Sequence, residues 1–154
     1  MMSRLRSLGL DERGNSLIEM AFIAPLLATL IVGSADLSRG VSAKLQVEQA
    51  AQRSIELVQR SDYKTADKAT YEADAQAAAG TGSTATLTAW LECNGNGVHL
   101  DIDTGSCAAT DTLAKYVQMS VQKPFTPLFG TRFFSGANSN GTVTVHATAG
   151  IRVR

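Results

Sequence analysis

The sequence has few of the residues that mark enzymes and nucleic-acid-binding proteins. Its 154 residues include two histidines, two cysteines and one tryptophan, and 14 basic residues balance 14 acidic ones. A chain without net charge has no overall field that attracts nucleic acid or another polyanion. No nucleophile motif, glycine-rich phosphate loop or Walker pattern occurs. These absences argue against an enzyme and against a nucleic-acid partner, and we predict no cofactor.

Metal ligands are equally sparse. His99 and His146 each alternate with apolar neighbours in a predicted strand, which places both side chains on a solvent-exposed face. The segment Asp101–Gly105 resembles a calcium loop in its acidic residues, but its glycine stands fifth and no glutamate stands twelfth. The sequence therefore predicts no metal site and no catalytic residue.

One long apolar run dominates the N-terminal part. Leu17–Val32 contains a single charged residue, Glu19, and basic residues precede the run. With Gly33–Ala35 added, the run approaches the roughly 20 residues that span a bilayer as a helix. Basic residues before such a run favour a cytoplasmic leader. We therefore predict a single-pass protein of the inner (cytoplasmic) membrane with an extracytoplasmic C-terminal domain.

The apolar run allows three interpretations. A secretory signal would be cut near Gly33–Ala35, but such a signal gains nothing from a charge at Glu19. A plain signal anchor explains the hydrophobicity, and Ser16 with Glu19 then forms a capping box at the helix start. A prepilin-like segment is instead cut after Gly14, which makes Asn15 the first mature residue.

The third interpretation gives Glu19 a role in subunit assembly. A cut after Gly14 creates an α-ammonium group on Asn15, at the top of an apolar helix. A buried carboxylate without a partner is costly. Glu19 gains a partner when the ammonium group of a neighbouring subunit packs beside it. Glycine at the cut lets a peptidase approach the backbone closely, and Pro25 is expected to kink the helix or to remove one hydrogen bond.

A particular order of residues runs through this segment. It comprises Arg13-Gly14, Glu19, Pro25-Leu26-Leu27, Gly33, Asp36 and Arg39, followed by Gln49-Ala50-Ala51-Gln52-Arg53. This order resembles the TadE-like minor pilins (pseudopilins) of the tight-adherence, or Tad, pilus system. Met20 stands where such proteins often carry an aromatic residue, and its large apolar side chain suits the same packing. The sister family TadF and other TadE-like subtypes remain open.

The resemblance implies a function in pilus biogenesis and surface adhesion. It implies processing by a prepilin peptidase and assembly with other pilins and pseudopilins of the same system, at an inner-membrane platform. Membrane lipid is a further expected partner. The alternative is a membrane-anchored extracytoplasmic binding module that is neither cleaved nor polymerised.

Periodicity predicts the fold of the remaining chain. A four-residue spacing of apolar side chains continues the first helix to about Arg60, and a second helix covers Ala66–Ala79. Alternating apolar residues then predict four strands in an antiparallel meander, at 85–91, 98–102, 117–121 and 143–153. The sum is an α+β, type IV pilin-like fold, in which the amphipathic half of the long helix covers one apolar face of the sheet.

The predicted organisation has four parts. These are a prepilin leader at 1–14, a transmembrane and assembly helix at 15–35, an amphipathic helical region at 36–80 and an antiparallel β-domain at 81–154. Cys93 and Cys107 both lie beyond the apolar run, and such a pair in an exported domain forms a disulfide. In a cytosolic protein they would be two free thiols. Prolines 124 and 127 are expected to end the third strand, and the Phe125–Phe134 loop to pack beneath the sheet or to form a binding patch.

Overall fold

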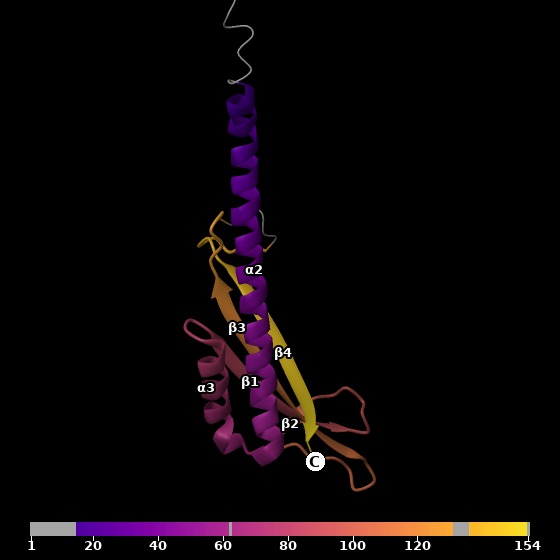
Figure 1. The fold of residues 1–154 in the computed structure, drawn as a ribbon. Helices are drawn as coiled ribbons and strands as arrows, with labels where there is room; N and C mark the ends of the chain where they lie inside the picture. The colour runs from indigo at the N-terminus through magenta and orange to yellow at the C-terminus, as the bar shows by residue number, and fades with distance from the viewer. Residues whose placement is uncertain (1–14, 62, 131–135, 154) are drawn as a thin grey trace, which may run out of the picture. The chain divides into compact units, whose positions relative to one another are not determined.

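The structure is a computed structural model that describes residues 15–61, 63–130 and 136–153. Its elements, in chain order, are α2 (Asn15–Ser61), the 3₁₀ turn η2 (Thr65–Asp67), α3 (Lys68–Ala79), β1 (Thr84–Cys93), β2 (Leu100–Asp101), β3 (Leu113–Phe125) and β4 (Val143–Val153) (Figure 1). The chain divides into two compact units, an N-terminal unit up to Ser38 and a C-terminal unit from Arg39 onward. A long N-terminal helix and a four-stranded antiparallel sheet confirm the predicted α+β class.

Both helices end close to the predicted positions. α2 ends at Ser61, one residue beyond the expected end. α3 starts at Lys68 because the residues just before it form the tighter turn η2. Gly80 ends α3: its φ angle is 87°, and its N–H donates to the Gln76 carbonyl at 2.9 Å. A positive φ at this position is favourable for glycine and strained for residues with a Cβ atom.

The strand order is β2-β1-β3-β4, so the predicted meander is wrong. β2 lies at the edge of the sheet and not between β1 and β3. The reason is that β3 forms a longer hydrogen-bonded ladder with β1 than β2 does. β3 has 13 residues and pairs with β1 from Thr84↔Gln122 to Cys93↔Leu113, whereas β2 has 2 residues and pairs with Trp90 and Leu91 alone.

The third strand ends between the two prolines expected to end it, one residue beyond Pro124. β3 continues to Phe125, and Pro124 pairs with Thr144 of β4. The pairing of β3 with β1 stops at Gln122. At Pro124 the strand therefore has a neighbour on one side only, and a proline without an N–H group is tolerated at such an edge.

The core lies between one face of the sheet and two helical segments. α3 and the part of α2 after Arg39 lie on this face of the sheet (Figure 1). Every second strand residue points into the core, and the helices contribute mainly alanine and valine, which permit close approach. The buried apolar side chains of this cluster are Val47, Ala50, Ala51, Ile55, Val58, Tyr71, Ala75, Ala79, Ala85, Leu87, Val117, Met119, Val121 and Ala147.

The predicted apolar stripe of α2 is buried only in its later part. Val47 and Val58 are fully buried, but the side chains of Val41 and Leu45 are 51% and 50% exposed. A helix turns by about 100° per residue, so Val41 and Leu45 lie more than 100° around the axis from Val47. They therefore cannot face the sheet when Val47 does.

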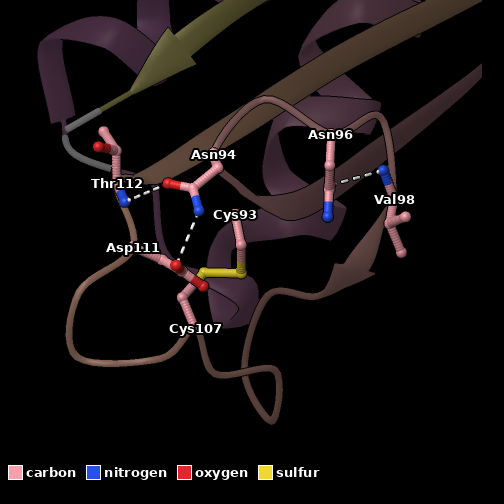
Figure 2. Close-up of a disulfide and its surroundings, with 7 residues drawn as sticks. All are labelled: Cys93, Asn94, Asn96, Val98, Cys107, Asp111 and Thr112. Atoms are coloured by element: carbon pink, nitrogen blue, oxygen red, sulfur yellow. Dashed lines mark hydrogen bonds between the residues drawn. A yellow bond between two sulfur atoms is a disulfide. The ribbon is translucent and has the colours of Figure 1, made fainter.

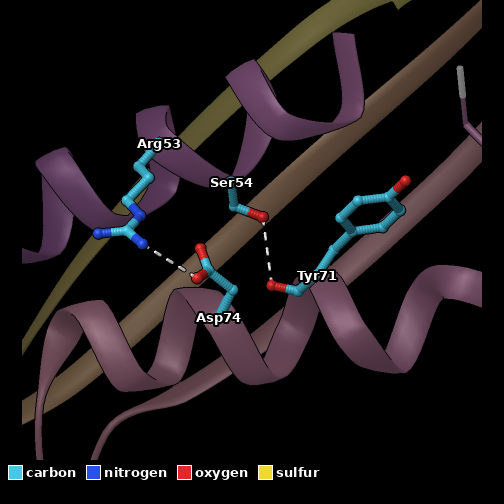
Figure 3. A network of polar contacts seen from close by, with 4 residues as sticks. All are labelled: Arg53, Ser54, Tyr71 and Asp74. Carbon is cyan, nitrogen blue, oxygen red and sulfur yellow. Dashed lines mark hydrogen bonds and ion pairs between the residues drawn. The ribbon is translucent and has the colours of Figure 1, made fainter. Parts of the chain in front are cut away.

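Polar contacts join α2 to α3 within the C-terminal unit, and Figure 3 shows two of them. The hydroxyl of Ser54, which is fully buried, donates to the Tyr71 carbonyl at 3.2 Å. The Arg53 guanidinium lies 3.3 Å from Asp74 Oδ1. The Ser54 contact satisfies a polar group that would be costly to bury alone. Together the two contacts fix α3 along α2.

α3 also protects an edge of the sheet. β2 pairs only near the end of β1, which leaves the Leu87 N–H without a ladder partner on that side. Glu72 of α3 accepts a hydrogen bond from this N–H through Oε1, at 2.9 Å. Open strand edges invite pairing with other chains, and this contact satisfies one backbone donor on the open edge of β1.

Candidate assembly segment and disulfide loop

The residues predicted for cleavage and assembly gather at the start of α2. Gly14 lies outside the described residues, and Asn15 is the first residue of the helix. Glu19 and Met20 follow one turn later, and both side chains are exposed. Pro25 lies inside α2, which continues on both sides of it. The fifth residue after the predicted cut is therefore a carboxylate in the first turns of a helix.

The capping box of Ser16 and Glu19 stays a prediction, because Asn15 is both the first residue of α2 and the first residue that the structure describes.

The first part of α2 is apolar on all sides. Its most apolar stretch of 18 residues has a mean hydropathy of 2.0, and 0% of that stretch is buried. Phe22 is 78% exposed, and Leu17 and Ile31 are similarly open. An all-round apolar helix is stable in lipid or among other apolar helices. By length and composition, this helix could cross a membrane once.

Two hydroxyl groups of this segment are satisfied by the helix itself. Thr29 Oγ1 donates to the Leu26 carbonyl, and Ser34 Oγ donates to the Ile31 carbonyl, both at 2.8 Å. Such local bonds remove the cost of placing a hydroxyl in lipid. Glu19 is the one ionisable side chain in the sequence between Asn15 and Ala35. Its carboxylate is therefore the exceptional group of the segment.

The C-terminal unit begins with a contact between α2 and the end of β3. The Arg39 guanidinium carbon lies 5.7 Å from the centre of the Phe125 ring, in a cation–π arrangement. A Cβ atom added to Gly40 would lie 3.6 Å from the same ring, so the two elements pack at ordinary contact distance. Phe125, the last residue of β3, is buried, whereas Leu128 and Phe129 in the loop after it are exposed. The rest of the aromatic loop, including Phe133 and Phe134, lies outside the described residues.

Comparison with known families places this geometry in context. Residues 14–55 match the family model of TadE-like proteins. We call these residues the TadE-like segment. No curated protein and no solved structure gives a significant match to the chain.

The two halves of the TadE-like segment differ in burial. Its first half is the apolar stretch with Glu19. Its second half supplies buried residues to the core of the C-terminal unit, among them Val47, Ala50 and Ala51, and its last residue, Ile55, is 7% exposed. The match therefore covers α2 almost completely and includes no residue of the sheet.

The predicted disulfide joins Cys93 and Cys107, whose Cα atoms are 5.6 Å apart (Figure 2). Cys93 ends β1, and the side-chain amide of the next residue, Asn94, both donates and accepts a hydrogen bond. The Asn94 side chain donates to Asp111 Oδ1 at 2.7 Å and accepts from the Thr112 N–H at 2.9 Å. The closed loop includes β2, whose two-residue ladder alone is too short to be stable. The disulfide therefore holds β2 at the edge of the sheet.

The acidic segment inside this loop forms a turn. Asp101 Oδ1 accepts hydrogen bonds from Asp103 N, Thr104 N and Thr104 Oγ1 at 2.9–3.0 Å. The Thr104 bonds, followed by that from Asp103, lower the pKa of the Asp101 carboxyl. A Cβ atom at Gly105 would lie 2.4 Å from the Asp101 carbonyl oxygen, which explains the glycine. Among the described residues, no group of three or more histidine, cysteine, aspartate or glutamate side chains could hold a metal ion.

Removal of the disulfide is expected to destabilise the C-terminal unit. For a Cys93→Ser and Cys107→Ser double variant, the chain-entropy model gives a loss of about 3 kcal/mol in the free energy of unfolding for a loop of this size. Urea unfolding of the purified chain in detergent, followed by Trp90 fluorescence, measures the loss. Reduction of the unmutated chain is the matched control and should give the same shift. A change below about 0.5 kcal/mol, typical of a neutral surface substitution, would contradict the role given to the bond.

The strand predicted for His99 is wrong, and its surroundings were not foreseen. His99 lies in the loop before β2, and its ring stacks on Trp90 with centroids 4.5 Å apart. His99 Nε2 is 3.4 Å from Glu92 Oε1, which also accepts from Trp90 Nε1 at 3.0 Å. His146 does lie on a strand, β4, and is exposed as expected. The sequence signal for the cluster was weak, because only the register brings His99 next to Trp90.

Proposed function

We propose that this protein is a minor pilin or pseudopilin, a structural component or assembly factor of a Tad-type pilus. The match of residues 14–55 to TadE-like proteins carries the proposal, because it begins at the predicted cleavage point and includes Glu19 and the whole apolar stretch. In this role the protein acts in pilus biogenesis and surface adhesion.

The chemistry of α2 supports assembly through its N-terminal part. The helix exposes large apolar side chains all round, and the hydroxyls of Thr29 and Ser34 are satisfied internally. Packing against like helices would cover these side chains and leave both of these hydroxyls bonded. The one charge, Glu19, then needs a cationic partner in the apolar assembly. The α-ammonium of Asn15 on a neighbouring subunit, created by the cut after Gly14, is that partner.

The proposed partners and location follow from the same segment. The partners are a prepilin peptidase, other pilins and pseudopilins of the same system, an inner-membrane assembly platform and membrane lipid. The protein begins as a single-pass inner-membrane protein with its C-terminal domain outside the cytoplasm, and it enters a cell-surface pilus after processing. The fold class supports this proposal, since the helix and the sheet have the pilin-like order.

The N-terminus of the mature protein tests the proposal directly. We expect mass spectrometry of the protein from native membranes to find Asn15 as the first residue, because the peptidase cuts after Gly14. A bulky β-branched residue at the cut blocks close approach to the backbone, so a Gly14→Val variant should remain at full length. An unmutated chain that starts at Met1 would overturn the proposal and favour the uncleaved binding module. A chain that starts near Asp36 would indicate a secretory signal.

A further inference from the structure

The face of the sheet opposite the helices carries an aromatic stack that ends beside a hollow. His99, Trp90 and Tyr116 stack in that order across the sheet, with the Trp90 and Tyr116 centroids 5.7 Å apart at an interplanar angle of 20°. Trp90 and Tyr116 are direct cross-strand partners, and Tyr116 is opposite Arg152 on β4. Since β4 follows β3 in the sheet, the ring face of Tyr116 away from Trp90 looks toward β4.

A hollow of about 220 Å³ lies at this position. Its lining includes Tyr116, Gln118, Thr148, Gly150 and Arg152. Gly150 stands opposite Gln118 in the ladder and has no side chain, which leaves the space beside Tyr116 open. The volume is below the roughly 300–1,000 Å³ of pockets for drug-sized ligands. It therefore suits a single ring.

The groups around the hollow are a flat aromatic face and polar side chains. The quadrupole of an aromatic ring makes its face negative. This face attracts polarised C–H groups, such as those on one face of a pyranose ring. Gln118 and Thr148 offer an amide and a hydroxyl for sugar hydroxyls. Arg152 is the one charged residue of the lining. Within the described part of the chain, its guanidinium has no hydrogen bond, ion pair or ring contact. A guanidinium pairs preferentially with a carboxylate in bidentate geometry.

We propose that this hollow binds a hexuronate residue of an acidic polysaccharide. The pyranose ring stacks on Tyr116, the sugar carboxylate pairs with Arg152, and Gln118 and Thr148 bind hydroxyl groups. On the side of Tyr116 away from the hollow, the Trp90 ring is held in position by its hydrogen bond to Glu92 and by stacking with His99. Charge complementarity favours an acidic sugar over a neutral one, and the amide of Gln118 and the hydroxyl of Thr148 favour a sugar over an apolar side chain of a partner protein.

The full-length chain in detergent provides the test, with trigalacturonate as the probe and neutral galactotriose as its uncharged counterpart. Trp90 is the chain's one tryptophan and touches Tyr116, so its fluorescence reports the occupied hollow. We expect saturable binding of trigalacturonate with a Kd of about 1 mM or below, and galactotriose at least about tenfold weaker. Absence of saturable trigalacturonate binding, or equal binding of both probes, would overturn the proposal. Binding of an aromatic peptide in its place would point to a protein partner.

Three variants separate the parts of the hollow. Arg152→Gln should weaken trigalacturonate about tenfold and leave galactotriose unchanged, because it removes one charged partner. Tyr116→Ala should weaken both sugars. Gly150→Val fills the hollow, keeps Gln118, Thr148 and Arg152 in the chain, and should abolish binding. Its Cβ would lie 3.4 Å from the Val117 carbonyl oxygen and 3.7 Å from Gln118 Cβ, which the strand can accommodate. Thr84→Val, at the other end of the same face, is the matched control and should bind like the unmutated chain. Unchanged binding by both Gly150→Val and Arg152→Gln would exclude this site.

Discussion

A Glu19→Ala variant is expected to be cut like the unmutated chain and to be lost from assembled pili. The peptidase acts after Gly14, five residues before the substitution, so processing should continue. Assembly should fail because the α-ammonium of Asn15 loses its partner in an apolar contact. Breaking a buried ion pair from one side costs about 3–5 kcal/mol. Since 1.4 kcal/mol corresponds to a factor of ten, subunit association should fall by roughly 100-fold or more.

Immunoblots of sheared pili and of membranes measure the two outcomes separately. Glu19→Gln keeps the size of the side chain and removes its charge, so it should fail like the alanine variant. Glu56→Ala is the matched control, since Glu56 is an exposed glutamate later in the same helix, and it should assemble normally. Normal assembly of Glu19→Gln would refute the charge-pair mechanism and leave packing as the role of this position. Loss of processing in Glu19→Ala would instead assign the residue to peptidase recognition.

The sequence determines the helices of this protein more clearly than its sheet. Spacings along α2 and α3 are local, because a helix forms its hydrogen bonds within a few residues. The ends at Ser61 and Ala79 were therefore predicted within one residue. An error in α2 came from phase: Val41 and Leu45, which are four residues apart, were assigned to the same stripe as Val47, although the helical angle places them on another face.

Sheet order was harder to predict because partners of a strand are distant in the sequence. The Val98–Ile102 segment alternates like a strand, and the Asn94–Gly97 turn before it suggests that it joins β1 and β3 in a meander. In the structure it keeps a two-residue ladder, while β3 takes the other side of β1. Strand length decides this outcome, since each ladder pair adds hydrogen bonds and cross-strand contacts. No local pattern reports which strand offers the longer ladder.

The aromatic stack was equally hard to predict from the sequence, because its residues are also distant from one another along the chain. Trp90 and Tyr116 are 26 positions apart in the sequence, and Gly150 and Arg152 are further still. None belongs to a motif, and only the ladder register brings Tyr116 between Trp90 and Arg152.

Glu19, in contrast, could be identified from the sequence, because its signal is local. A single carboxylate in an apolar run conflicts with its surroundings, and such conflicts are visible without a structure.

The centre of the core is expected to respond most strongly to a cavity. Leu87 is fully buried in the middle of β1, directly opposite Met119 of β3. A Leu87→Ala variant should lower the free energy of unfolding by about 2–5 kcal/mol, because it loses apolar transfer energy and leaves a cavity that the neighbours fill only in part. Urea unfolding in detergent, followed by Trp90 fluorescence, measures the loss, and an unchanged slope would show that the unfolded state is unaffected.

Leu113→Ala provides the matched control for this measurement. The substitution is the same and lies in the same sheet, but the Leu113 side chain is 43% exposed. Less apolar surface is transferred to water there, and solvent fills the space, so the loss should be below about 1 kcal/mol. Equal losses in the two variants would contradict the position of the core between β1, β3 and the two helices. A large loss at Leu87 alone is the result expected of a core centred on the buried layer that contains Leu87 and Met119.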